Sequence, residues 1–204
     1  MLRVFVTCRS RSWFWSLALV GLLMLLSSCG DSAPSAKHAT WTNYQGKAFV
    51  MNYFSSWGVA KKDLYLGTSY PQLEMLQGMA FTSPESATTF VHVVYAENTD
   101  GKASVSDLLR KYILGKLKQP IAASSLTTTT LAGETWSQGV VEKQVSTNNA
   151  STVLIKEAAL GVNHVVNANK KEIYLIIYQD ETSSFDKTAK DFFTRMVSSF
   201  RFGS

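Results

Sequence analysis

Residues 164 to 180 have the sequence HVVNANKKEIYLIIYQD, which determines the type of sheet. Two segments rich in Val, Ile and Tyr flank a short centre of Asn and Lys residues. β-Branched and aromatic residues favour strands, and a short polar break between two such segments is typical of a tight turn. The stretch therefore predicts two antiparallel strands, and with them an antiparallel sheet.

Outward from this stretch, further segments have the same strand character. Ala87–Glu97 is rich in Val, Thr and aromatic residues, and the turn Asn98–Gly101 follows it. Residues 58–71 contain two glycines and a proline, so we expect a loop there. The other expected strands are Lys47–Phe54, Gln72–Phe81, Leu126–Val145 and Ser151–Leu160.

Two segments, Ser104–Lys118 and Ser183–Phe200, have a helical period instead. Apolar residues fall on one face of each, and the apolar face of the second must cover a sheet. Both begin with a serine followed three residues later by an aspartate, a pattern that resembles a capping box. Helices on a central antiparallel sheet predict an α+β fold in a single domain, residues 43–204.

The first 28 residues predict an export signal. Three arginines in the first twelve residues precede the fourteen-residue apolar run Trp13–Leu26. This run is shorter than the roughly 20 residues that a membrane-spanning helix needs, but it suits the apolar core of a secretory signal. Without these residues the chain has 17 basic and 15 acidic side chains, a net charge of +2. Such a balance argues against nucleic acid as a partner.

Leu26-Ser27-Ser28-Cys29 resembles the lipobox of bacterial lipoproteins. The resemblance implies that diacylglycerol is attached to the thiol of Cys29, that the signal is cut before it, and that acyl chains such as palmitate hold the protein on the extracytoplasmic face of the cell membrane. Residues 29–42 are then a flexible tether. The alternative is an uncut signal anchor with an idle Cys29. Because Cys8 leaves with the signal, the mature chain has no disulfide and no cysteine nucleophile.

The body contains four short motifs, Tyr53–Trp57, Phe81–Pro84, Leu131–Gly133 and Ser199–Phe202. They resemble motifs of the PsbP-like family, that of the extrinsic subunit of photosystem II and its bacterial relatives. The similarity covers about residues 44–202 and implies an antiparallel sheet flanked by helices, usually without a catalytic centre. Many members help to assemble or stabilise larger complexes. At the expected proline of the first motif this chain has Phe54.

Catalytic and metal-binding patterns are missing from the sequence. There is no G-x-S-x-G, no H-E-x-x-H and no phosphate loop. His92 lies within an expected strand and His164 at the start of another, and no carboxylate spacing turns them into a metal site. An EF-hand counted from Glu97 would place Leu108 where glutamate is required. We therefore expect no catalytic residue, no metal and no cofactor, although a weak calcium site stays open.

The sequence leaves two main hypotheses for function. The first is a non-enzymatic accessory or scaffold lipoprotein that binds a partner protein at the outer face of the membrane. The second is a lipoprotein that binds a small molecule, peptide, glycan or metal ion. An exported hydrolase is a third. The surroundings of Trp57 and Trp136 distinguish them, because a deep polar pocket favours a ligand and a flat apolar surface favours a partner protein.

Overall fold

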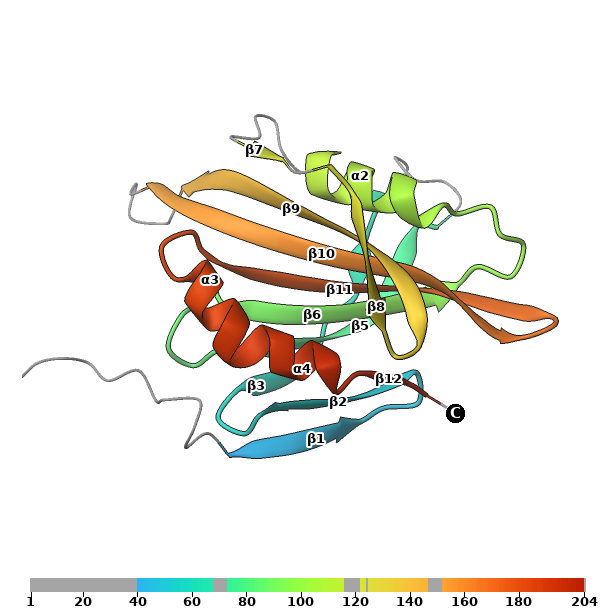
Figure 1. Cartoon of the computed structure of the whole chain (residues 1–204), viewed down its shortest axis with the longest axis horizontal. Coiled ribbons are helices and arrows are strands. Elements are labelled where there is room, and N and C mark those ends of the chain that lie inside the picture. The colour runs from blue at the N-terminus through green and yellow to red at the C-terminus, as the bar shows by residue number, and fades with distance from the viewer. Residues whose placement is uncertain (1–39, 68–72, 116–121, 124, 147–151, 204) are drawn as a thin grey trace, which may run out of the picture. The chain divides into compact units, whose positions relative to one another are not determined.

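A computed structural model describes residues 40–67, 73–115, 122–123, 125–146 and 152–203, all within the unit Ala39–Ser204 (Figure 1). Its main feature is a large antiparallel sheet with the strand order β3-β5-β6-β11-β10-β9-β7, in which β4 also pairs with β5 and β8 with β9. Its strands are β3 (Gly58–Lys61), β4 (Leu64–Tyr65), β5 (Met75–Thr82), β6 (Phe90–Glu97), β7 (Ala122–Ala123), β8 (Thr127–Leu131), β9 (Glu134–Ser146), β10 (Thr152–Asn167) and β11 (Lys170–Glu181).

A smaller sheet and two helical segments complete the described fold. The small sheet has the order β1-β2-β12, and its last strand follows the C-terminal helix directly. That helix consists of three consecutive parts, α3, η2 and α4 (Figure 1). The bounds are β1 (Trp41–Gln45), β2 (Phe49–Phe54), α2 (Val105–Gly115), α3 (Phe185–Thr188), η2 (Ala189–Phe193), α4 (Thr194–Ser198) and β12 (Arg201–Phe202).

The hairpin expected at residues 164–180 is confirmed. β10 and β11 pair antiparallel from Ile155 opposite Glu181 to Asn167 opposite Lys170. β11 is flanked by β6 and β10, so it lies inside the sheet. This position explains why its apolar residues run without interruption, because a central strand with both faces covered has no solvent-facing side.

The alternating residues of β11 divide the core into two parts. Tyr174, Ile176 and Tyr178 face one cluster, which includes residues of the C-terminal helix and of the small sheet. Ile173, Leu175 and Ile177 face the other cluster, which contains buried residues of α2. All six side chains are at most 1% exposed. Burying a large apolar side chain contributes about 1.5–3 kcal/mol, so β11 is the centre of the hydrophobic stabilisation.

The expected α+β class is wrong. Of the residues that the structure describes, 57% are in strands and 16% in helices, so the fold is antiparallel and sheet-dominated and not a sheet flanked by helices. Both segments with a helical period do form helices, but these helices are short. By contrast, β9, β10 and β11 span 13, 16 and 12 residues. An apolar pattern predicts whether a segment is a helix or a strand better than it predicts how long the segment is. In this chain the fold class depends on the length of the strands.

The expected loop at residues 58–71 is also wrong in part. Gly58 pairs with Thr82 and Lys61 with Met79, so β3 forms the edge of the large sheet, and β4 follows it. A glycine does not exclude a strand at the edge of a sheet, because backbone hydrogen bonds hold such a strand and a packed side chain is not needed. The buried Trp57 precedes this strand and anchors its start in the core.

The two helix starts differ from each other. The backbone N–H of Asp107 donates to the Ser104 hydroxyl at 3.4 Å, as a cap requires. The second cap is not formed as expected, because Ser184 is the N-cap residue and its side chain makes no capping bond. Phe185, Met196 and Phe200 are buried in the core, so the apolar face of this helix is confirmed. None of the helices in the described part of the chain has the length and apolar character of a membrane span.

Candidate functional site

A groove of about 310 Å³ follows the C-terminal helix where the helix packs on the large sheet. One wall comes from β8, the floor from β9 and β10, and the other wall from the end of η2 and from α4. Apolar groups dominate, with hydroxyl and amide groups between them. Its lining includes Thr129, Leu131, Val140, Ala158, Phe193 and Val197.

A small residue keeps the floor of the groove low. Ala158 of β10 lies opposite Val140 of β9, and both line the groove. The next residue of β10, Ala159, belongs to the core cluster on the other face of the sheet. The methyl group of Ala158 does not fill the space between a helix and a sheet, which ordinarily pack about 10 Å apart, so space is left open beside the helix.

The helical wall contains a turn that is wider than an α-helical turn. Residues 189–193 form a π-helical segment, and the Thr194 hydroxyl donates to the carbonyl of Ala189, five residues earlier, at 2.9 Å. Phe193 ends this segment and stacks on Tyr178 at 4.7 Å between ring centroids. Turns of this kind are rare and occur frequently at functional sites, since they re-aim the side chains that follow. Here the turn places Phe193 against both the core and the groove.

Strand β8 forms the open rim of the groove. Among the strands of the described residues it pairs with β9 alone, so its other edge presents backbone N–H and C=O groups without a strand partner. Its sequence, TTTTL, has neither a charge nor a proline, the usual protections of an edge. Ala132 and Gly133 then reverse the chain, with φ of 51° and 82°, as a type I′ hairpin turn requires.

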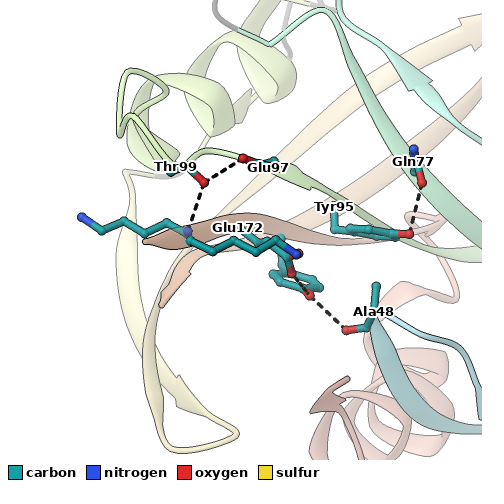
Figure 2. Close-up of polar contacts among 9 residues, drawn as sticks. Ala48, Gln77, Tyr95, Glu97, Thr99 and Glu172 are labelled. Atoms are coloured by element: carbon teal, nitrogen blue, oxygen red, sulfur yellow. Dashed lines mark hydrogen bonds and ion pairs between the residues drawn. The ribbon is translucent and has the colours of Figure 1, made fainter. Parts of the chain in front are cut away.

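A polar cluster surrounds Glu172, close to the small sheet (Figure 2). The Tyr174 hydroxyl lies 2.6 Å from Glu172 Oε2 and 3.0 Å from the carbonyl oxygen of Ala48, so its single proton is shared between two acceptors. Lys170 Nζ lies 2.6 Å from Glu172 Oε1. Nearby, the Tyr95 hydroxyl donates to Gln77 Oε1 at 3.2 Å. The cluster thus connects β11 of the large sheet to the start of β2.

The charges of this cluster are well defined. Burial by itself raises the pKa of Glu172, but hydrogen bonds from Lys170 and Tyr174 outweigh burial and lower this pKa below its usual value. Burial, and then the hydrogen bond to Glu172, raise the pKa of Tyr174 far above that of a free phenol. At neutral pH the carboxylate is therefore ionised and the phenol is protonated, which is the arrangement of a structural link.

His164 does not form a site with His92. Its Nδ1 lies 2.6 Å from Glu134 Oε1, and its ring stacks on Phe202 with 3.7 Å between centroids. His92 is 4% exposed and its Nε2 lies 2.6 Å from the carbonyl oxygen of Lys62. Since the two histidines face different positions of β11, they do not share a ligand. The sequence alone does not predict the contact of His164 with Glu134, because this contact depends on which strands become neighbours in the sheet.

The remaining candidate site residues either make structural contacts within the fold or lie outside the described residues. Cys29, the expected signal and the expected tether up to residue 39 lie outside the described residues. Trp57 and Trp136 are buried in the core, and the Trp136 indole N–H donates to the Leu131 carbonyl at 3.0 Å. Asp100, of the turn considered for calcium, pairs with Lys102 at 2.7 Å. Within the described ranges, no three His, Cys, Asp or Glu side chains group as metal ligands would.

Comparisons with known proteins add little. No family model matches the chain, and no curated protein sequence matches it. One similar solved structure bears the description "Crystal structure of LpqN involved in cell envelope biogenesis of Mycobacterium tuberculosis". The match covers 82% of this chain and 92% of that chain, at 13% identity and a TM-score of 0.44. A cell-envelope protein is compatible with the expected bacterial lipoprotein, but similarity this low carries no argument. The PsbP-like resemblance stays a prediction.

Proposed function

We propose that this chain is a membrane-anchored extracytoplasmic lipoprotein whose folded domain binds a partner protein and catalyses no reaction. The anchor rests on the lipobox resemblance at Cys29, and the accessory role on the resemblance to PsbP-like proteins. The observation that carries partner binding is the groove beside the C-terminal helix together with the unprotected strand β8 on its rim.

The proposed partner supplies an extended segment with an apolar residue at every second position. Such a segment pairs with the open edge of β8 through backbone hydrogen bonds, and its alternate side chains enter the groove. In the groove, Leu131 and Val197 offer apolar contacts to the side chains of this segment. Hydroxyl groups of the lining offer hydrogen bonds to its polar atoms. Backbone pairing supplies the affinity, and the groove selects the side chains.

Two substitutions on one strand test this proposal. Thr129 lines the groove, whereas Thr128 does not and its side chain points to the opposite face of the strand. Thr129→Arg places a long charged side chain in the groove, and Thr128→Arg adds the same charge outside it. Each variant, with a C-terminal tag and Cys29 intact, is crosslinked in native membranes, and the captured proteins are quantified by mass spectrometry.

We expect wild type and Thr128→Arg to retain one protein at near-equal stoichiometry and Thr129→Arg to lose it. Retention by both variants would show that the groove is not the binding surface. If none of the three captures a stoichiometric protein, partner binding is refuted.

The second candidate function is binding of a small ligand, and the size of the groove favours it. A volume of about 310 Å³ is at the lower end of ligand pockets, which range from about 300 to 1,000 Å³. If the groove binds a small ligand, a native-membrane extract should protect the wild-type protein against thermal unfolding. Thr129→Arg should abolish this protection, and no crosslinked partner should be captured.

A further inference from the structure

A second and smaller pocket lies between the β1–β2 turn and the edge of the large sheet. Its volume is about 110 Å³, and its lining comes from β1, the β1–β2 turn, β2, β3, β5 and β6. A water molecule occupies about 30 Å³ in the liquid, so the pocket has room for one small polyatomic group. Tyr95 and Gln77, which Figure 2 shows joined by their hydrogen bond, belong to this lining.

The polar groups of the lining are mainly hydrogen-bond donors. Gln77 accepts from Tyr95 with its carbonyl oxygen, and this leaves its amide N–H groups for another acceptor. Burial, and then the neighbouring Tyr95, raise the pKa of Tyr44, so its phenol stays protonated at neutral pH. Lys47 and Lys61 also line the pocket, and an ammonium group has three donors and no acceptor.

The charge around the pocket is positive. Lys47 has no ion-pair partner among the described side chains. Lys61 lies 3.6 Å from Asp63, but the lysine side chain is 73% exposed, so this pair is weak. One oxygen of Asp63 also accepts from the backbone N–H of Gly78 at 3.1 Å. The nearby carboxylate of Glu172 is already neutralised by Lys170.

We propose that this pocket binds the phosphate group of an anion, either inorganic phosphate or the phosphate of a larger molecule such as a lipid headgroup. The two lysines supply the charge, and Tyr44 and Gln77 supply directed hydrogen bonds to the oxygens. Lysine is a common ligand of phosphate because its ammonium acts as a point charge on a long, flexible stem. A cation or a donor-rich neutral group finds no matching set of acceptors there. The site is independent of the partner-binding groove.

Nuclear magnetic resonance of the full chain in a neutral detergent tests the site. Inorganic phosphate and, separately, glycerol 3-phosphate are added up to about 50 mM at constant ionic strength, and the backbone amide shifts are followed. Saturating shifts are expected at Lys47, Gln77 and Gly78. Lys47→Gln/Lys61→Gln should raise Kd by about tenfold, and the control Lys187→Gln/Lys190→Gln should leave it within about twofold. The urea midpoints verify folding.

The two ligands distinguish the source of the phosphate. Glycerol 3-phosphate that binds as tightly as inorganic phosphate or tighter indicates a headgroup or another phosphate ester, and clearly weaker binding indicates the free ion. Either result supports the site. Shifts that do not saturate, or an equal loss of affinity in the control variant, would overturn the proposal, because they would mean diffuse attraction to surface lysines.

Discussion

Tyr174→Phe removes one hydroxyl from the core and leaves the ring in place. The phenol donates at 2.6 Å to the carboxylate of Glu172, a largely buried group, and lies 3.0 Å from the carbonyl of Ala48. A hydrogen bond to a charged group contributes about 1.5–3 kcal/mol, and the ring contacts are unchanged, so we expect a loss of about 2 kcal/mol in the free energy of unfolding. Urea unfolding followed by circular dichroism measures this loss.

The pH dependence separates this link from a general loss of packing. The pKa of Glu172 is lowered in the folded state, so its contribution to stability is complete above the ordinary glutamate pKa of 4.5 and disappears as pH falls through the lower folded pKa. The difference between wild type and Tyr174→Phe should therefore narrow in acid. Glu172→Gln is the control, because in that background Tyr174→Phe should cost clearly less. A loss below about 0.5 kcal/mol, or a loss independent of pH, would refute the reasoning.

Three further predictions concern other parts of the chain. The carboxylate of Glu157 is 2% exposed and lies 2.8 Å from Lys143 Nζ, so Lys143→Met leaves a buried charge without its partner. The substitution should lower the free energy of urea unfolding by about 3 kcal/mol. A loss below about 1 kcal/mol would mean that the pair behaves as an exposed one. Ala132→Asn relieves a left-handed backbone of φ 51° and should raise the unfolding free energy by about 0.5–1 kcal/mol, whereas a decrease would contradict the assigned turn. Cys29→Ser should abolish incorporation of labelled palmitate and release the protein from membranes, and persistent labelling would exclude Cys29 as the anchor.

The central hairpin could be predicted because its signals are local. Residues Ile173–Tyr178 are apolar on both faces of the strand, and the polar turn before them is short. A run of this kind is consistent with a strand in the middle of a sheet, and β11 has strands on both sides. The apolar face of the last helix was equally visible, since Phe185, Met196 and Phe200 keep a helical spacing.

The fold class could not be predicted because it depends on lengths and edges. β9 extends over 13 residues, from Glu134 to Ser146, and includes polar residues that give no strand signal on their own. They are held in the strand by pairing with β10, a contact between residues that are distant in sequence. Local propensity is a weak guide in such a position, since the context of the sheet overrides it.

Neither proposed site has a sequence motif, and the reason is geometric. The groove needs the small Ala158 beside the helix, a π turn before Thr194, and a strand β8 whose outer edge is open. None of these residues is unusual alone, and only the packing of the C-terminal helix against β8, β9 and β10 brings them together. One local signal did exist. TTTTL before the Ala132-Gly133 turn is a β-branched run without charge or proline, the composition that edge strands ordinarily avoid. Because an unprotected edge is a hazard for a solitary protein, its presence beside an apolar groove is the observation from which we propose a partner that pairs with it.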